Sequence, residues 1–394
     1  MKILLIHNEY QQSGGEETVV GQEHRLLENA GHQVIPYRRS NWETESLTGV
    51  KRLGILPRMI WASDSRRDVL ELLCGEKPDV VHVHNTFMVI SPSIYSACFE
   101  AGVPVVQTLH NFRLFCPAAF YFRDGKVCEE CTQYSLLRGI RYGCYRESRA
   151  TTAAVAAMLA SHRLLGTWHS KISAFIALTE FARGRFAAGG LPAGKIRVKP
   201  NFMDPDPGPR AGDGEYALFV GRLSPEKGVA TILDAWSHLP KAIPLKIVGD
   251  GPLASALKSE AQQRGLSSVE FVGRLPREQT IDAMKRARFV LFPSLWYENF
   301  PMTIVEAFAC ATPVICSRLG AMAEIVRDGQ LGMNFAVGDA QDLAAKSDWA
   351  WNHCAEMRSM GERARAEYQE RYTPQRNYQL LMAIYEEALG RQRS

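Results

Sequence analysis

The chain has 394 residues, a length that favours two domains of about 200 residues each, and each could bury a sizeable core. Its composition, 46% hydrophobic and 22% charged, is that of a globular protein and excludes disordered and fibrous classes. The net charge of +4 is too mild to suggest a nucleic-acid-binding protein. It is compatible with anionic small molecules or with a lipid surface where arginines cluster.

The opening segment, MKILLIHNEY, contains an apolar run far shorter than the core of a signal peptide and predicts a first strand. No stretch approaches the roughly 20 apolar residues of a membrane span. We therefore expect a cytoplasmic location with reduced cysteines, so a disulfide framework is not expected.

Short β-rich runs alternate with helical patterns along the whole chain, which predicts βαβ units on parallel sheets. In the first half the strands are expected at 2–6, 79–83 and 103–109, and helices at 16–30 and 92–101. In the second half the strands are expected at 217–220, 245–248, 269–272, 289–292 and 313–316. The predicted fold class is α/β, with two Rossmann-like, doubly wound domains.

A stretch rich in proline and glycine, residues 200–215, separates the two halves and is too rich in turn formers for a helix or a central strand. We expect an amino-terminal domain at 1–200, a linker at 201–215 and a carboxyl-terminal domain at 216–373. Residues 374–394 carry apolar side chains at helical spacing. They predict an amphipathic helix that packs on one of the domains, with the amino-terminal domain a candidate.

The segment VGRLSPEKG, residues 220–228, joins a strand to a helix through a turn that carries Arg222 and Lys227. Two cations beside a helix amino terminus suit a dianion such as a diphosphate, because the free N–H groups and the helix dipole favour negative charge. The alternative is a solvated basic turn.

Two glycine-containing turns also follow predicted strands. Gly14 and Gly15, preceded by Ser13, open the first helix, where glycine lets the backbone approach a phosphate closely. Gly249 and Gly251 end a later strand. A simple turn would look the same in both places.

Glu298 and Glu306 lie in SLWYENFPMTIVEAFACATPVI, after the predicted strand at 289–292. The carboxyl ends of parallel strands are where open α/β sheets bind ligands. Both glutamates have apolar or aromatic neighbours, and carboxylates in such surroundings usually hydrogen-bond hydroxyls or balance a cation. We expect sugar or ribose hydroxyls, the alternative being two solvated acids.

Three histidines, His82, His84 and His110, lie at the ends of two predicted strands of the first half. A metal triad is one interpretation, but none of them has a partner at the i, i+4 spacing typical of ligands. We prefer an interpretation in which one or more faces a cleft between the domains. His110 is the first choice because it ends its strand.

These motifs, in this order, resemble those of the large family of retaining, nucleotide-sugar-dependent glycosyltransferases called family 4. The resemblance spans both halves, is strongest from 200 to about 338, and includes Gly14, Gly15 and His110. It implies the GT-B fold, in which two Rossmann-like domains face each other across a cleft that holds the donor.

The resemblance also implies a role for each matching residue. Arg222 and Lys227 would hold the donor diphosphate, and Glu306 the ribose hydroxyls. Glu298 would contact the transferred sugar, with Gly14 and Gly15 closing over the phosphate and His110 touching the sugar. The remaining expected donor-binding residues are Gly249, Gly251, Asn299 and Phe300.

Fixed cations and helix N–H groups would stabilise the leaving diphosphate, so no catalytic metal is expected. Retention by front-face attack would explain why no nucleophile is placed. The chain departs from the family pattern at Asn299 and Pro301, and at the Ala321-Met322-Ala323 segment, which leaves the donor sugar open.

An insert at about 112–147, the mark of a subgroup, contains four cysteines, Cys116, Cys128, Cys131 and Cys144, spaced C-x11-C-x2-C-x12-C. Four thiolates could hold a structural zinc ion. Reduced core thiols are an equal alternative, and an iron–sulfur cluster is a third.

Arginines and aromatic residues surround the insert, with an alanine-rich helix expected at 150–165. As a cluster they favour an acceptor with a pyrophosphate-linked lipid, or an anionic membrane leaflet. Ordinary solvated arginines are the alternative for any single residue.

These observations favour a cytoplasmic retaining glycosyltransferase, peripheral on the inner face of the plasma membrane where the arginine cluster acts. Its donor would be a UDP- or GDP-linked sugar, and its acceptor a glycan or a polyprenyl-diphosphate-linked glycan, in cell-surface or exopolysaccharide synthesis. Two alternatives remain, a nucleotide-sugar epimerase or hydrolase of the same fold and a non-catalytic nucleotide-sugar-binding subunit. Nucleic acid is not an expected partner.

Overall fold

The computed structural model of the protein describes residues 1–11, 14–44 and 55–393, so Ser13 lies outside the described residues. The chain divides into two compact units, each described here by itself. The first comprises Met1–Tyr121, Glu129–Pro200 and Asn377–Ser394, and the second comprises Phe122–Cys128 and Asn201–Arg376.

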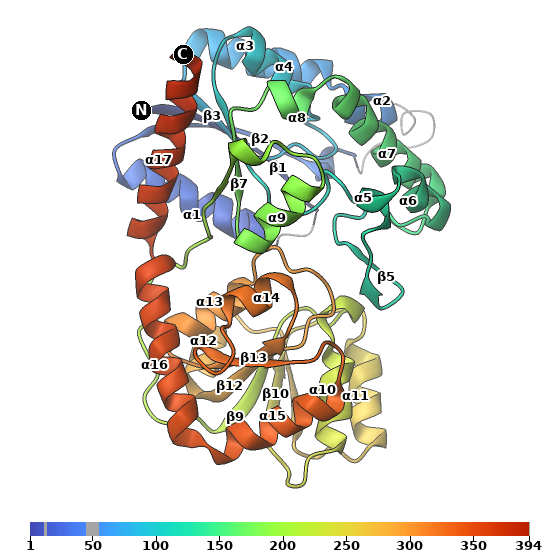
Figure 1. Ribbon diagram of the computed structural model, residues 1–394, viewed down its shortest axis with the longest axis vertical. Helices are drawn as coiled ribbons and strands as arrows, with labels where there is room; N and C mark the ends of the chain where they lie inside the picture. The colour runs from blue at the N-terminus through green and yellow to red at the C-terminus, as the bar shows by residue number, and fades with distance from the viewer. Residues whose placement is uncertain (12–13, 45–54, 394) are drawn as a thin grey trace. The chain divides into compact units, whose positions relative to one another are not determined.

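The first unit is built on a six-stranded parallel sheet in the order β2-β1-β3-β4-β7-β8 (Figure 1). Its strands are β1 (Lys2–Glu9), β2 (Gln33–Ser40), β3 (Val80–Asn85), β4 (Val105–Thr108), β7 (Ala174–Ala177) and β8 (Ile196–Val198). The chain winds outward from β1 to β2 and then in the other direction from β3 to β8. The strand order therefore reverses between β1 and β3, where doubly wound sheets bind ligands.

Helices connect these strands. They are α1 (Gly15–Asn29), α2 (Ile55–Ile60), α3 (Ser63–Glu76), α4 (Ile94–Glu100), α5 (Glu130–Gln133), α6 (Leu136–Tyr142), α7 (Arg149–Leu164), α8 (Thr167–Ser170) and α9 (Glu180–Ala188). A small antiparallel hairpin, β5 (Phe122–Arg123) with β6 (Lys126–Val127), interrupts the series. None of the helices in the described part of the chain combines the length and the apolar character that a bilayer crossing requires.

The last helix, α17 (Pro374–Arg393), belongs to the first unit from Asn377 onward. The Tyr385 hydroxyl lies 2.7 Å from Nδ1 of His82 on β3. Asn377 accepts a hydrogen bond from buried Lys199, and Glu387 pairs with Arg197 on β8. Side chains of α17 are therefore hydrogen-bonded to buried polar residues of this unit, namely His82 and Lys199.

The second unit has its own six-stranded parallel sheet, in the order β11-β10-β9-β12-β13-β14 (Figure 1). Its strands are β9 (Tyr216–Val220), β10 (Leu245–Val248), β11 (Val269–Gly273), β12 (Ala287–Phe292), β13 (Val314–Ser317) and β14 (Gly332–Phe335). Its helices are α10 (Val229–Ser237), α11 (Ala254–Gln263), α12 (Arg277–Arg286), α13 (Met302–Ala309), α14 (Gly320–Ile325), α15 (Ala340–Asn352) and α16 (Cys354–Arg371). The order reverses between β9 and β12.

Alternating residues of the central strands face two separate cores, as the twofold period of a strand requires. Leu218 on β9 packs with Phe308 of α13 in one core. Its neighbour Phe219 packs with Ile232 of α10 and Leu343 of α15 in the other. Both faces of the sheet are therefore covered by helices, which explains why its strands read as continuous apolar runs.

The predicted fold class is confirmed, with two α/β units each built on a parallel sheet. The expected strands of the second half all form within a few residues of their expected bounds. The strands β2, β7, β8 and β14 were not predicted from the sequence. Of these, β2 is an edge strand with Pro36 and polar residues, and β8 has only three residues, so neither carries the apolar run of a buried strand.

The loops after β9 and β10 lie in backbone contact. Gly249 has φ +141°, and a Cβ on it would lie 1.8 Å from the carbonyl oxygen of Gly221. A Cβ on Gly251 would lie 2.5 Å from the carbonyl oxygen of Leu223. The Leu223 N–H donates to Asp250 O at 3.0 Å, which locks the two loops together. Packing alone therefore requires glycine at both positions.

We expect Gly249→Ala to destabilise the second unit by at least about 2 kcal/mol, because the side chain meets backbone at a strained φ. Urea unfolding followed by tryptophan fluorescence measures the loss. The matched control is Gly184→Ala on α9, where a Cβ meets no atom within 4 Å. There the helix propensity of alanine should leave stability unchanged or raise it by up to about 1 kcal/mol. Equal midpoints for Gly249→Ala and the wild type would contradict the packing account.

Candidate functional site

The candidate site of the second unit lies where the strand order of its sheet reverses. The loop after β9 carries Arg222 and Lys227, and the loop after β12 carries Glu298. Because β9 and β12 are neighbours and parallel, both loops leave the same edge of the sheet. The sequence motifs from two distant segments therefore meet at a position typical of ligand binding.

Lys227 and Glu298 are in direct contact. The Lys227 Nζ donates to Oε1 of Glu298 at 2.6 Å, although 71 positions separate the residues. The lysine also lies 5.3 Å from the ring centroid of Trp296, within the range of a cation–π interaction. The ion pair joins the two loops across the reversal point.

The glycine at the start of α10 brings these loops together. A Cβ on Gly228, at φ +68°, would lie 2.1 Å from the carbonyl oxygen of Pro293. The Leu295 N–H donates to Glu226 O at 2.8 Å beside it. The sequence feature Lys227-Gly228 is therefore a docking point for the loop that carries Glu298.

One oxygen of the buried Glu298 carboxylate is saturated. Its Oε1 accepts from Lys227, from Ser294 Oγ at 2.7 Å and from Trp296 Nε1 at 2.9 Å. Its Oε2 has no hydrogen-bond partner within the described residues, so it is the oxygen left for a ligand. The three donors compensate the burial of the charge and fix the orientation of the carboxylate.

Arg222 is the second cation of the loop after β9. Its side chain is exposed, and its guanidinium makes no ion pair or hydrogen bond in the part of the chain that the structure describes. Unlike Lys227, it is not neutralised by a neighbouring carboxylate. Five N–H donors on a planar group make it suited to a phosphate.

Glu306 lies on α13, partly buried, and its carboxylate makes no hydrogen bond or ion pair among the described residues. Burial raises the pKa of Glu306, and the charge of Arg277 offsets only part of the rise. A partly buried carboxylate without hydrogen-bond donors is unfavourable for stability. The hydroxyl groups of a ligand would supply these donors.

The other expected donor-binding residues of this unit are held by contacts within the unit itself. Phe300 packs on Tyr372, with ring centroids 6.0 Å apart, at the edge of one core. Asn299 is buried beside Glu298. Gly249 and Gly251 are held in the loop contact described above, and a ligand is not needed to explain them.

In the first unit, Gly14 is the N-cap of α1 and Gly15 is its first residue. The Gly14 N–H donates to Oε2 of Glu17 at 2.7 Å, and the N–H of Tyr10 donates to Oε1 of the same residue at 3.1 Å. A Cβ on Gly15 would meet no atom within 4 Å. Packing against the described residues therefore does not require a glycine at Gly15.

His110 follows β4, is partly exposed and lines a cavity with His84, Asn85 and Arg113. Its Nε2 lies 2.9 Å from Nδ1 of His84. Burial, and then the charge of His84, lowers the pKa of His110 well below its usual range. The imidazole is therefore neutral and can donate from one nitrogen and accept at the other.

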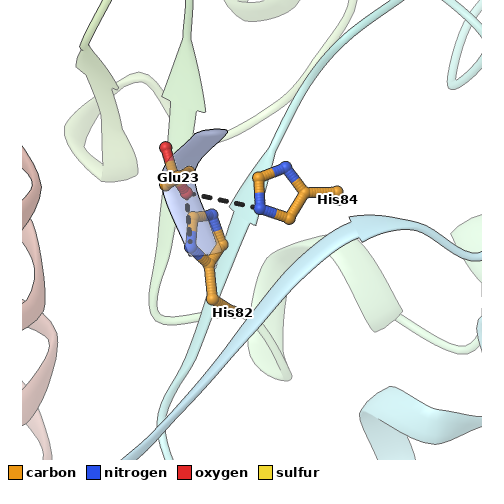
Figure 2. Close-up of side chains that lie close together, drawn as sticks. All are labelled: Glu23, His82 and His84. Carbon is orange, nitrogen blue, oxygen red and sulfur yellow. Dashed lines mark ion pairs between the residues drawn. The ribbon is translucent and has the colours of Figure 1, made fainter. Parts of the chain in front are cut away.

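Within the described residues, one group of three side chains has ligand atoms within 4.8 Å of one another: Glu23, His82 and His84 (Figure 2). The metal triad considered from sequence, with His110 as third member, is therefore not formed. The ammonium of Lys199 lies 2.6 Å from Glu23 Oε2, and all these side chains are buried. A metal ion here would lie close to a buried cation that already neutralises the carboxylate, so the group does not fit a metal site.

The tentative zinc site of the insert is not formed by the described residues. Cys116, Cys128, Cys131 and Cys144 contribute no three ligand atoms within that distance of one another. Burial also raises the pKa of the Cys116 thiol, whereas zinc binds the thiolate. Along the chain, the β5–β6 hairpin and the short helices α5 and α6 lie between Cys116 and Cys144. The ligand-like spacing in the sequence therefore does not produce a metal site.

Sequence reasoning missed the partners of the predicted residues. Ser294 and Trp296 orient Glu298, and Glu23 and Lys199 lie behind the histidines. One signal was present, because Glu23 lies on the apolar stripe of α1 that ends at Leu27. A carboxylate on a buried helix face needs a buried partner.

Two family models match this chain. The family model described as Glycosyltransferase Family 4 matches residues 13–207, and the model described as Glycosyl transferases group 1 matches residues 204–367. The two matches overlap at residues 204–207, close to the point in the sequence at which the first unit ends with Pro200 and the second continues from Asn201.

Curated relatives match parts of the chain. A glycosyltransferase of uncharacterised specificity from Methanocaldococcus jannaschii is 31% identical over 176 residues, 45% of this chain and 49% of that protein. The O-antigen chain mannosyltransferase C of Escherichia coli is 34% identical over 160 residues, 40% of this chain and 43% of that protein. The matched region thus spans about half of each relative.

Among solved structures, HepE of Anabaena in complex with UDP has a TM-score of 0.68 at 19% identity and covers 98% of this chain and 100% of its own. At this identity the likeness shows the fold, and the family models give the family. The chain belongs to the glycosyltransferases of the group 1 and family 4 type, with the GT-B architecture.

Proposed function

We propose that the protein is a retaining glycosyltransferase that moves a hexose from a UDP- or GDP-linked sugar to a glycan or a lipid-linked acceptor. The observation that carries the proposal is the Lys227–Glu298 ion pair at the strand-order reversal, with Arg222 unpaired beside it. This arrangement offers cations for a diphosphate and a fixed carboxylate oxygen for a hydroxyl. The O-antigen enzyme among the relatives supports a surface polysaccharide as product.

Each residue then has a defined task. Arg222 and Lys227 bind the diphosphate, and the amino terminus of α10 adds free N–H groups. Glu306 accepts the ribose hydroxyls, and Oε2 of Glu298 accepts a hydroxyl of the transferred sugar. Asn299 and the loop with Gly249 and Gly251 shape the donor site. From the first unit, Gly14 and Gly15 leave room for phosphate, and His110 contacts the sugar.

The reaction breaks the bond between the anomeric carbon and the β-phosphate oxygen. The acceptor oxygen forms the new bond on the same face, and its proton passes to the departing phosphate oxygen. Negative charge grows on the diphosphate as this bond breaks, and the fixed cations stabilise it without a divalent metal. Retention of configuration follows from front-face attack.

Product analysis tests the reaction. With a nucleotide sugar and an acceptor, the protein should give a glycoside of unchanged anomeric configuration, read from the ¹H coupling constants. Free sugar or an epimerised donor formed without any acceptor would instead identify a hydrolase or an epimerase. Binding of a nucleotide sugar with no product under any condition would identify a non-catalytic subunit.

Removing either cation should weaken nucleotide binding. Arg222→Ala and Lys227→Ala each remove charge-assisted hydrogen bonds worth about 1.5–3 kcal/mol, so affinity should fall about 10- to 100-fold. Calorimetry with UDP, GDP and ADP measures the change and names the preferred base. UDP is the first candidate because HepE was solved with UDP and with UDP-glucose.

Arg286→Ala is the matched control for these variants. Arg286 is an exposed arginine of the same unit that pairs with Glu215 at the start of β9 and β12, the opposite edge of the sheet from the site. Its removal should leave nucleotide affinity unchanged. If all three variants bind as the wild type does, the diphosphate does not bind at this loop.

Glu306→Gln should raise the stability of the protein at pH 7 and weaken its binding of nucleoside diphosphate. The folded state raises the pKa of Glu306, so the folded protein binds more protons than the unfolded chain, and stability falls as pH rises from the unfolded pKa of about 4.3 through the folded value. The neutral amide removes this cost. The variant should therefore be more stable than the wild type at pH 7 and equal to it below pH ~4.

Nucleoside diphosphate affinity should fall in the same variant, because an amide oxygen is a weaker acceptor for ribose hydroxyls than a carboxylate. Thermal unfolding across the pH range, with and without UDP, reads both effects. A Glu306→Gln variant that binds as tightly as the wild type would remove Glu306 from the ribose site.

We also propose that the first unit binds its acceptor at an anionic lipid surface. Around α6, Tyr134 and Leu137 are each 70% exposed, and Tyr142 is 46% exposed. The arginines beside them are Arg138, Arg141, Arg146 and Arg149, all exposed. Aromatic and aliphatic side chains ringed by arginines are typical of a peripheral membrane contact, which would place the protein on the cytoplasmic face of the plasma membrane.

Flotation with liposomes tests this surface. The wild type should float with vesicles of phosphatidylglycerol and phosphatidylcholine. The triple variant Arg141→Ala, Arg146→Ala, Arg149→Ala should float several-fold less, because each arginine contributes about 1 kcal/mol to binding at an anionic surface. The control triple removes the same charge from the second unit, at Arg264, Arg286 and Arg358. Equal loss in both triples, or no flotation of the wild type, would contradict the proposal.

A further inference from the structure

A buried polar cluster lies behind His110 in the first unit. Glu23 comes from α1, His82 and His84 from β3, and Lys199 follows β8. All four are buried, which is unusual for two charged residues and two histidines together. The metal interpretation fails at Lys199, and the proposed reaction leaves the cluster without a role.

The contacts form a chain that ends at His110. Lys199 Nζ lies 2.6 Å from Oε2 of Glu23, and the other oxygen, Oε1, lies 3.3 Å from Nε2 of His84 (Figure 2). On the far side of the ring, Nδ1 of His84 lies 2.9 Å from Nε2 of His110. Oε1 also lies 3.1 Å from Nδ1 of His82, whose Nε2 meets Thr108 rather than His110.

The charge at the start of this chain is fixed. Burial raises the pKa of Glu23, but Lys199, followed by His82 and His84, holds it well below its usual range. Glu23 is therefore an anion with lone pairs only. Among the described residues, neither Oε1 of Glu23 nor Nε2 of His84 has a hydrogen-bond partner, so their 3.3 Å approach is an electrostatic contact.

The positions of the protons follow from the carboxylate. A lone pair on Nε2 of His84 would face the lone pairs of Glu23 across 3.3 Å in a buried site, whereas an N–H there faces an acceptor. In its neutral form, His84 therefore carries its proton on Nε2 and accepts at Nδ1. His110 must then donate from its own Nε2, which leaves Nδ1 without a proton.

We propose that Glu23, acting through His84, fixes His110 as the Nε2–H tautomer, so that Nδ1 of His110 accepts a hydrogen bond from a ligand hydroxyl. Nδ1 has no partner among the described residues, and His110 lines the cavity. This inference rests on the proposed function for the identity of the ligand, a hydroxyl of the transferred sugar. An acceptor at this position selects a hydroxyl and disfavours a phosphate oxygen. Glu23 and His84 are positioning residues.

The tautomers can be read directly by two-bond ¹H–¹⁵N correlation spectra of the full chain labelled in histidine, with signals assigned by single His→Gln variants. His84 and His110 should both show the Nε2–H pattern in the free protein. A wild-type spectrum in which His110 carries its proton on Nδ1 would overturn the proposal, whether or not any variant folds.

Glu23→Gln should reverse the relay. Lys199 can only donate, so the amide oxygen of Gln turns toward it and the amide N–H groups turn toward His84. His84 then accepts at Nε2 and donates from Nδ1, and His110 moves its proton to Nδ1. An unchanged His110 pattern in a folded Glu23→Gln protein would also overturn the proposal.

Kinetics separate positioning from general damage. In Glu23→Gln, kcat/KM for the nucleotide sugar should fall about 10-fold, because a donor faces the sugar hydroxyl. Affinity for the nucleoside diphosphate, which lacks that hydroxyl, should stay within twofold of the wild type, a change of about 0.4 kcal/mol in binding free energy. The control Glu28→Gln, on the same helix and paired with His24, should change neither value.

Failure of the inference and failure of the proposed function give different results. A wild type with the expected tautomers that transfers no sugar contradicts the glycosyltransferase proposal and supports the proton assignment. A wild type that transfers sugar while His110 carries its proton on Nδ1 contradicts the inference alone.

Discussion

The Lys227–Glu298 ion pair is the contact on which the arrangement of the second unit's site depends. A buried carboxylate is costly unless donors surround it, and here Lys227, Ser294 and Trp296 all serve one oxygen. The contact forms only because Gly228 lets the loop after β9 touch the loop after β12. The side chains of this loop pair are therefore held in place by the protein itself, and the proposed stabilisation of a leaving group would require such preorganisation.

The first unit solves the same physical problem with different residues. Glu23 is buried and paired with Lys199, as Glu298 is with Lys227, and each carboxylate lies near the reversal of its own sheet. In the second unit the paired carboxylate keeps one oxygen for a ligand. In the first unit its second oxygen faces histidines instead, so its influence reaches the partly exposed His110 only through His84.

The sequence was sufficient for the fold class, because central strands covered on both faces are continuous apolar runs, as β9 and β12 are. It was insufficient for β2 and β8, where edge position and shortness remove that pattern. For the site, it predicted Arg222, Lys227 and the two glutamates as donor-binding residues, and the structure places Arg222, Lys227 and Glu298 on neighbouring loops. It could not identify which charge pairs with which, because Lys227 meets Glu298 from 71 positions away and Lys199 meets Glu23 from 176.

The cysteines and the histidines show how spacing along the chain can mislead. Four cysteines in ligand-like spacing gather no metal group in the described residues, whereas Glu23, from a helix that no metal pattern marked, joins two histidines. In both cases, the charge on the buried side chains decides whether a metal ion can bind. Lys199 supplies the positive charge that a metal would otherwise bring. Burial lowers the pKa of His82 well below its usual range, and a neutral imidazole has one donor and one acceptor whose assignment depends on its neighbours. Under the proposed function, cations would hold any nucleoside diphosphate alike, so discrimination among sugars would come from such directional groups.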